Sequence, residues 1–221
     1  MDRDRITNDQ VNEFLRSHLN PYHGIFKELE VYAEENAIPI VQPEVARLIC
    51  MLAKLNHTKR ILEVGCAIGY STLLFSEACP DAEVVTIERD EAMIQLAEAN
   101  IKKAGKSDKI RILKGDAREV VPELSQNEEN QKFDFIFLDA AKSRYNDFLP
   151  HCIQLLVPGG LLVCDNVLFR GMVAREYDKV PHAIRTIYYR LNEFHDALQN
   201  NTDLESTVIP MGDGVSVSIR K

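Results

Sequence analysis

The apolar residues within the first 57 positions recur with a helical period. Spacings of three and four residues mark three segments, as expected for helices that each bury one face. Their apolar positions are Val11, Phe14 and Leu15, then Ile25, Phe26, Leu29 and Tyr32, then Val45, Leu48, Ile49, Leu52 and Leu55. Pro21, Pro39 and Pro43 separate the segments, because proline is tolerated only in the first turn of a helix. We predict three N-terminal helices.

A different pattern begins near residue 60, where short apolar runs alternate with helix-length segments. The runs cover residues 60–64, 83–87, 110–113, 133–138 and 160–164. This alternation is typical of parallel strands joined by crossover helices. A last helical stripe runs from Val180 to Leu198, and two strand-like segments joined by the turn Met211–Gly214 end the chain.

These elements predict an α/β fold of the Rossmann-like type. We expect a seven-stranded, mostly parallel, doubly wound sheet with an antiparallel C-terminal hairpin and extra N-terminal helices. The chain has 221 residues, of which 45% are hydrophobic and 27% charged, as in ordinary globular proteins. That length favours one domain over residues 1–221, with helices in 1–57 and the Rossmann-like core in 58–221. The polar stretch 125–132 is expected to be a surface loop.

Charge and cysteine content narrow the function classes. The net charge is −8, so the field of the whole protein opposes non-specific nucleic-acid binding, and an RNA partner would need a local basic patch. Five cysteines without C-x-x-C spacing argue against a disulfide framework and a thiolate zinc site, and they favour a cytoplasmic protein. No apolar run approaches the ~20 residues of a membrane span, and the first twenty residues lack the apolar core of a secretion signal. We therefore expect no membrane partner.

Acidic residues stand at or near the ends of five predicted strands. In an open parallel sheet, ligands bind outside the carboxyl ends of the strands. The five residues are Glu63, Glu88, Asp116, Asp139 and Asp165. Because grouped carboxylates repel one another, this rim predicts cationic ligands such as a metal ion or a sulfonium. Any one of them, taken singly, is equally compatible with a helix cap.

A glycine loop follows the first predicted strand. Residues 63–71 (EVGCAIGYS) read as a strand end, a tight turn and a helix start, either a plain connection or one whose amides face a ligand. The dinucleotide fingerprint G-x-G-x-x-G is incomplete, because Ala67 replaces its second glycine and the third is absent, which argues against a nicotinamide-dependent dehydrogenase. Glu88, at the end of the next strand, suits the hydroxyls of a ribose. A nucleoside without pyrophosphate, such as S-adenosylmethionine (SAM), fits best.

Four motifs in order along the chain carry a family resemblance. They are residues 63–71, 139–145 (DAAKSRY), 165–167 (DNV) and the turn 212–214 (GDG). With these motifs the chain resembles the metal-dependent, catechol O-methyltransferase-like family, a class of Rossmann-like SAM-dependent methyltransferases. Within that family, residues 165–173 and 209–214 are similar to the bacterial enzymes that methylate 5-hydroxyuridine at the tRNA wobble position.

The resemblance implies a metal site and a general base. Asp139, Asp165 and Asn166 would bind a divalent cation, expected to be Mg²⁺, and oxygen ligands without His or Cys suit a hard cation. Lys142 would be the catalytic base that accepts the proton of the acceptor hydroxyl, which the metal acidifies. The alternatives are an Asx turn after a strand for Asp165 and Asn166, and an ordinary solvated side chain for Lys142.

The resemblance also implies a set of SAM-binding residues. Gly65 and Ser71 would contact the methionine end, Glu88 the ribose and residues 116–117 the adenine. For Val41, a hydrophobic contact before a helix is an equal alternative. The full set is Val41, Glu63, Gly65, Tyr70, Ser71, Glu88, Asp116, Ala117, Asp139 and Arg144.

Two acceptor classes stay open. A catechol chelates a metal through adjacent oxygens, and so does 5-hydroxyuridine through its 5-hydroxyl and 4-carbonyl. Residues 167–195 carry a net charge of +2 with tyrosines interleaved, which favours a tRNA anticodon loop, unless this is an ordinary solvated helix face. The expected RNA contacts are Arg170, Arg175, Arg185 and Tyr189.

The alternative substrate is a small catechol or caffeoyl-type phenol. A non-catalytic RNA-binding protein is a further alternative, which the intact set of Asp139, Lys142, Asp165 and Asn166 disfavours. The resemblance also implies a homodimer.

Overall fold

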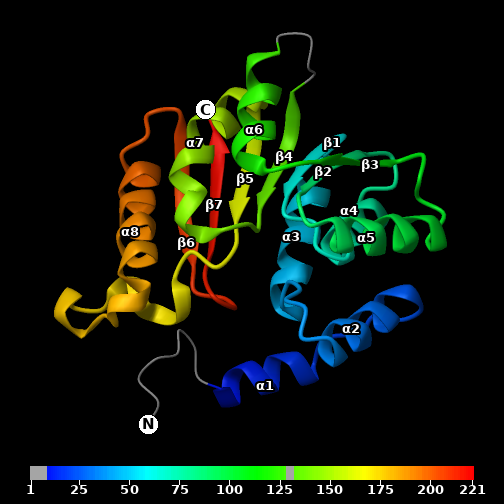
Figure 1. Cartoon of the computed structure of the whole chain (residues 1–221), viewed down its shortest axis with the longest axis horizontal. Coiled ribbons are helices and arrows are strands. Elements are labelled where there is room, and N and C mark those ends of the chain that lie inside the picture. Colours follow the sequence, from blue (N-terminus) through cyan, green and yellow to red (C-terminus); the bar gives the residue numbers. More distant parts are fainter. Residues whose placement is uncertain (1–8, 128–131) are drawn as a thin grey trace.

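A seven-stranded sheet forms the middle layer of the computed structural model, which describes residues 9–127 and 132–221 (Figure 1). The strand order is β3-β2-β1-β4-β5-β7-β6, with β1 to β5 parallel and β7 antiparallel to both of its neighbours. The strands are β1 (Arg60–Val64), β2 (Glu83–Glu88), β3 (Ile110–Lys114), β4 (Phe133–Leu138), β5 (Leu156–Cys164), β6 (Leu204–Ile209) and β7 (Val215–Arg220). The predicted fold class is confirmed.

Helices cover both faces of this sheet. They are α1 (Asp9–Ser17), α2 (Ile25–Glu35), α3 (Pro43–Leu55), α4 (Tyr70–Ala78), α5 (Glu91–Lys103), α6 (Ala117–Gln126), α7 (Tyr145–Leu155) and α8 (Arg185–Gln199). Short 3₁₀ turns are also present in the described part of the chain: η1 (Lys142–Arg144), η2 (Phe169–Ala174), η3 (Tyr177–Lys179) and η4 (His182–Ile184). Helix α8 begins later than predicted, because Pro181 disfavours helical geometry at the residue before it. Within the predicted polar loop, residues 125–126 belong to α6, whereas 128–131 lie outside the described residues.

The alternation of side chains along the strands separates two apolar layers. Ile61 and Phe137 pack with residues of α3 and α4 on one face. Leu62 and Ile136, one position along the same strands, pack with residues of α7 and α8 on the other. Successive side chains of a strand point to opposite faces, so Glu63 shares the α3 and α4 side with Ile61.

Helix α1 departs from the predicted burial. The side chains of its apolar stripe, Val11, Phe14 and Leu15, are 51%, 61% and 49% exposed. Leu55, at the end of α3, is also exposed, whereas Leu29 and Ile49 are buried as predicted. Periodicity predicts that a helix has an apolar face, but it does not say whether another part of the same chain covers that face.

The structure bears on the predictions about disulfides and membrane spans. All five cysteines are buried free thiols, consistent with the absence of a disulfide framework. Among the described residues, no helix combines the length and apolar character needed to cross a bilayer. The division into a helical segment 1–57 and a core 58–221 within one domain, and the cytoplasmic location, stay predictions.

Candidate active site

Two adjoining cavities open at the carboxyl ends of the parallel strands. The larger has a volume of about 930 Å³ and the smaller about 410 Å³. Gly65, Glu88, Asp139 and Ala140 line both of them. The two cavities therefore meet at the ends of β1, β2 and β4, where the sequence predicts ligand binding.

Most of the predicted site residues line one of these cavities. The larger is lined by Val41, Tyr70, Ser71, Lys142, Asp165, Asn166 and Arg170. The smaller is lined by Asp116, Ala117 and Arg144. Residues expected beside an adenine thus lie at one end, those expected to bind a metal lie at the other, and Glu88 lies between them.

Asp139 and Asp165 bring two carboxylates together at the floor of the larger cavity. They directly follow the neighbouring parallel strands β4 and β5, and Asp165 is only 2% exposed. Burial and repulsion by Asp139 raise the pKa of Asp165, and burial raises the pKa of Asp139 against the opposing effect of Lys142. Asn166 adopts a positive φ of 59°, and its backbone N–H donates to Asp165 Oδ1 at 2.6 Å.

This donor set fits a hard divalent cation. A buried carboxylate and a partly buried one that repel each other gain from a cation between them, and an amide oxygen is a suitable further ligand. The described residues contain no group of three His, Cys, Asp or Glu side chains that could hold a metal ion. The site would therefore depend on Asn166 and on water or substrate oxygens.

Glu63 lies outside the lining of both cavities. It is fully buried beneath α4, where its Oε2 accepts hydrogen bonds from the hydroxyls of Thr72 and of Thr86, the latter at 2.7 Å. Its Oε1 has no hydrogen-bond partner among the described residues. Burial raises the pKa of Glu63 to about 7. Contact between Glu63 and a cofactor stays a prediction.

Gly65 is required by packing within the protein itself. Its φ is +103°, and a Cβ at this position would lie 2.1 Å from the backbone carbonyl oxygen of Asp139. The structure thus places the residue that follows β4 against Gly65, and contact between Gly65 and a cofactor stays a prediction. Glu88 stabilises the loop that follows β1, because its carboxylate accepts the backbone N–H of Ala67 at 2.9 Å. It also accepts the backbone N–H of the next residue, Arg89, at 2.8 Å.

Asp116 acts as a helix cap, one of the alternatives that the sequence leaves open. Its carboxylate accepts the backbone N–H of Arg118 at 2.9 Å and pairs with the guanidinium groups of Arg118 at 2.7 Å and Arg89 at 3.3 Å. Arg118 holds the pKa of Asp116 well below its usual range. The five acids of the rim therefore differ, because two arginines compensate the charge of Asp116, whereas burial raises the pKa values of Asp139 and Asp165.

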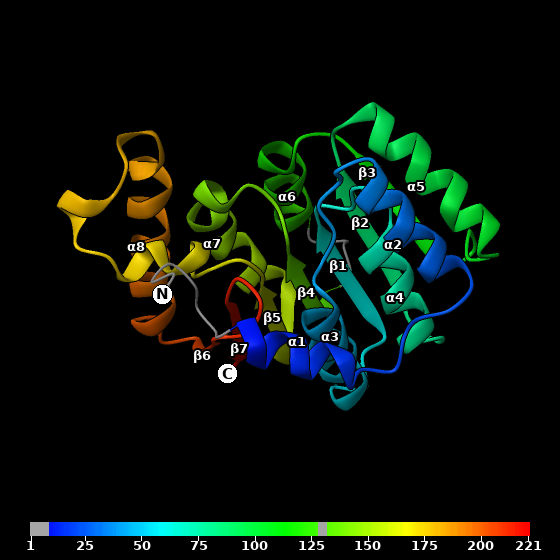
Figure 2. The ribbon, with the colours of Figure 1, turned by 90° about the horizontal axis from the view of Figure 1, so that it is seen from below.

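The N-terminal helix contributes cavity residues that the sequence interpretation missed. Asn12 and Arg16 of α1 line the larger cavity. Arg16 donates to both carboxylate oxygens of Glu44, at 2.9 and 2.7 Å, and to Gln42 Oε1 at 2.7 Å. These bonds join α1 to the start of α3, beside which it lies (Figure 2). No motif signals such a contact, since it joins segments distant in the sequence.

The turn between β6 and β7 holds the loop that follows β5. Asp213, which also lines the larger cavity, accepts the backbone N–H of Arg170, and Val167 N donates to the carbonyl of Gly214 at 3.0 Å. Phe169 and Arg170 both have positive φ, 46° and 53°, which non-glycine residues adopt rarely. The turn therefore maintains an unfavourable loop conformation that places Arg170 at the edge of the cavity.

Three of the four predicted RNA contacts, Arg175, Arg185 and Tyr189, lie at a cluster of tyrosines. Arg170 alone among the four lines a cavity. Tyr189 is 50% exposed and packs on Tyr177 with ring centroids 5.1 Å apart, and the Arg185 guanidinium lies 4.6 Å from the centroid of the Tyr177 ring. Tyr188 completes this tyrosine cluster and donates to the carbonyl of Arg175 at 3.1 Å. Tyr188 is partly buried, whereas Tyr177 and Tyr189 are exposed, and the three rings pack on one another.

Comparisons with known proteins agree with this geometry. A sequence profile described as O-methyltransferase matches residues 17–221. A caffeoyl-CoA O-methyltransferase of Populus kitakamiensis is 36% identical over 81% of this chain and 77% of its own length, and a catechol O-methyltransferase of Niastella koreensis is 33% identical over 82% of each chain. The crystal structure of the O-methyltransferase TomG from Streptomyces achromogenes, solved with SAM, has a TM-score of 0.84 at 26% identity, covering 100% of this chain and 99% of that one.

Fold and site together define a Rossmann-like methyltransferase. The chain belongs to the O-methyltransferase family, whose profile spans nearly all of it. Within that family its similarity is to enzymes of the caffeoyl-CoA and catechol type.

Proposed function

We propose that this protein transfers a methyl group from SAM to one hydroxyl of a small phenol that carries a second oxygen beside it, as in a catechol or a caffeoyl ester. The observation that carries the proposal is the placement of Lys142, Asp139, Asp165 and Asn166 around one cavity. A vicinal pair of oxygens is the chelating group that such a donor set would orient. Relatives of the caffeoyl-CoA and catechol type support this acceptor class.

SAM would occupy the smaller cavity and the adjoining part of the larger one. Asp116, Ala117 and Arg144 would contact its adenine side, Glu88 its ribose and Ser71 its methionine end. Bound SAM supplies the electrophilic methyl carbon.

A divalent cation held by Asp139, Asp165 and Asn166 would stabilise the anionic form of the acceptor oxygen. Lys142 lines the same cavity and accepts the proton of the acceptor hydroxyl. A bond then forms between that oxygen and the methyl carbon as the carbon–sulfur bond breaks. Fixed charges and alignment within the cavity lower the barrier.

A second candidate acceptor is 5-hydroxyuridine in a tRNA anticodon loop. The observation that favours it is the tyrosine cluster, with Tyr177 and Tyr189 exposed and Arg185 stacked on one ring. Exposed aromatic rings beside arginine are typical stacking surfaces for unpaired bases. Arg170 at the cavity edge would then contact the nucleotide nearest the reacting base.

A homodimer is part of the proposal. The exposed apolar face of α1, formed by Val11, Phe14 and Leu15, supports association through the N-terminal helices. Light scattering on the full chain tests it, since a monomeric mass at micromolar concentration would contradict a stable dimer.

A methyl-transfer assay separates the two acceptors. The protein is incubated with SAM and Mg²⁺ and with catechol, a caffeoyl ester or tRNA that contains 5-hydroxyuridine, and products are identified by mass spectrometry. Methylated phenol that disappears with a chelator supports the proposal. Methylated tRNA with unchanged phenols transfers the assignment to the second candidate, and no product from any acceptor contradicts both.

A further inference from the structure

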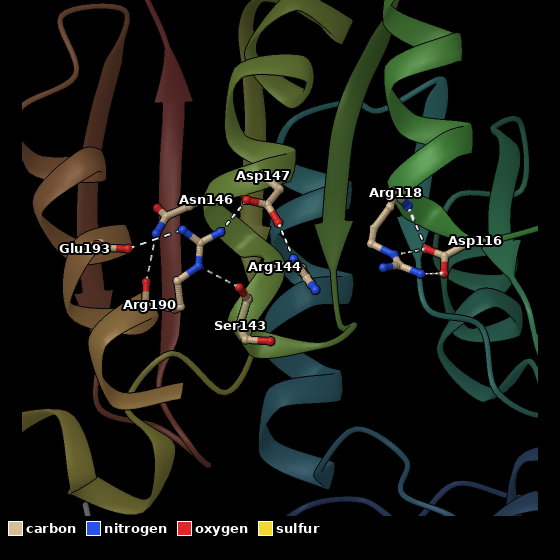
Figure 3. A network of polar contacts seen from close by, with 8 residues as sticks. All are labelled: Asp116, Arg118, Ser143, Arg144, Asn146, Asp147, Arg190 and Glu193. Atoms are coloured by element: carbon tan, nitrogen blue, oxygen red, sulfur yellow. Dashed lines mark hydrogen bonds and ion pairs between the residues drawn. The ribbon is translucent and has the colours of Figure 1, made fainter. Parts of the chain in front are cut away.

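Arg190 of α8 connects the helix to the short turn η1 that carries Lys142. Its Nε donates to the backbone carbonyl of Ser143 at 3.1 Å, one residue beyond Lys142. Its Nη2 pairs with one carboxylate oxygen of Asp147, at the start of α7 (Figure 3). In return, Asn146 Nδ2 donates to the carbonyl of Arg190 at 2.9 Å. The side chain thus fixes both the turn and the helix that follows it.

The same carboxylate also reaches the predicted SAM-binding side. The second oxygen of Asp147 accepts from Arg144 Nη1 at 3.2 Å, so Asp147 bridges Arg190 and Arg144. Arg144 in turn lines the smaller cavity. Asp147 therefore lies between the two arginines (Figure 3).

The turn needs external support because it is short. Residues Lys142–Arg144 form a single 3₁₀ turn, whose hydrogen-bond geometry is poorer than that of an α-helix. From below, Tyr145 Oη donates to the carbonyl of Asp165 at 2.9 Å, which ties the end of the turn to the end of β5. On the side of α8, Arg190 donates to the carbonyl of Ser143 within the turn. A planar guanidinium bonds a carbonyl and a carboxylate in a fixed geometry, whereas the donors of a lysine ammonium lack that rigid fork.

We propose that Arg190 is a positioning residue that holds the Lys142 turn in the geometry needed for proton transfer. This inference rests on the proposed function, in which Lys142 accepts the proton of the acceptor hydroxyl. Because the Arg190 guanidinium already contacts Ser143, Asp147 and Glu193, Arg190 is not counted among the basic residues of 167–195 that would contact RNA.

The test compares Arg190→Met, Arg190→Lys and a matched control, Glu193→Gln. Glu193 is 60% exposed and pairs with Arg190 at 3.4 Å on the side away from the turn. We expect Arg190→Met to lower kcat by about tenfold or more, as for a lost charge-assisted contact, and to change the pH dependence of kcat. Arg190→Lys should recover part of the loss, and Glu193→Gln should resemble the wild type. A merely structural role would reduce turnover equally at every pH.

Hydrogen exchange of the segment 142–147 gives a readout that does not depend on activity. The amide of Arg144, which donates to the carbonyl of Ala141 at 2.8 Å, should exchange faster in Arg190→Met but not in Glu193→Gln. Unchanged exchange and an unchanged pH profile would overturn the inference. If the wild type methylates no acceptor, the proposed function fails and the exchange result alone decides whether Arg190 holds the turn. If Arg190→Met does not fold, Asp147→Asn takes its place, and the hydrogen exchange of Arg144 and the pH dependence of kcat again decide the outcome.

Discussion

The burial of Glu63 predicts an unusual dependence of stability on pH. This carboxyl is fully buried between β1 and α4, and burial raises its pKa from the ordinary 4.5 to about 7. Between these values the folded protein holds a proton that the unfolded chain has released. The contribution of Glu63 to stability is therefore complete below about pH 4.5 and is lost as the pH rises toward 7.

The magnitude follows from the same two values. The difference between 4.5 and about 7 corresponds to about 3 kcal/mol at 1.36 kcal/mol per pKa unit. Glu63→Gln removes the titration while keeping an acceptor for the Thr72 and Thr86 hydroxyls. The free energy of unfolding of this variant should fall less steeply than that of the wild type across the interval, so the difference between the two curves should change by up to this amount between pH 4.5 and about 7.

Urea unfolding followed by circular dichroism at about pH 5, 6, 7 and 8, at constant ionic strength, measures the effect. Glu35→Gln is the matched control, because it makes the same substitution at an exposed glutamate at the end of α2. The difference in slope decides the outcome, since the new amide also changes the absolute stability. Parallel curves for the wild type and Glu63→Gln would show that burial does not keep this carboxyl protonated.

Three further predictions concern the ends of β1, β4 and β5. Gly65→Ala should lower the free energy of unfolding by about 3 kcal/mol or more, because its Cβ would overlap the Asp139 carbonyl oxygen; urea unfolding measures this, and a loss below about 1 kcal/mol would contradict it. Tyr145→Phe should lower the free energy of unfolding by about 1 to 2 kcal/mol, because it removes the buried hydrogen bond to the carbonyl of Asp165. An unchanged midpoint of thermal unfolding would contradict this prediction. Asp165→Ala should abolish Mg²⁺-dependent methyl transfer, whereas calorimetry should still detect SAM binding, because the predicted SAM-binding residues lie mainly on other strands. Methyl transfer that persists in this variant in the presence of a chelator would show that Asp165 is not a metal ligand.

The layout of strands and helices, and the rim on which the chemistry lies, follow from local pattern. A period of two or of about 3.6 is set by neighbouring residues, so the five parallel strands, the hairpin and most helices could be read directly from the chain. Ligands bind at the carboxyl edge of parallel strands, so the sequence alone predicts that Asp139, Lys142 and Asp165 lie around a common cavity.

Other features depend on contacts between residues far apart in the chain. Glu63 has the same residue type as Glu88, yet the pleat of β1 turns it under α4, where Thr72 and Thr86 bind it. Asp116 acquires partners from Arg89 and Arg118, which ends its part in a cation-seeking rim.

Arg190 and Ser143 illustrate the physical reason, since 47 positions separate them in the sequence and a hydrogen bond of 3.1 Å joins them in the fold. Hydrophobic periodicity records which face of an element is buried, whereas the partners of a polar side chain are set by the packing of whole elements against one another. The sequence pattern around a charged residue therefore does not show whether its side chain contacts solvent, a ligand or another part of the protein.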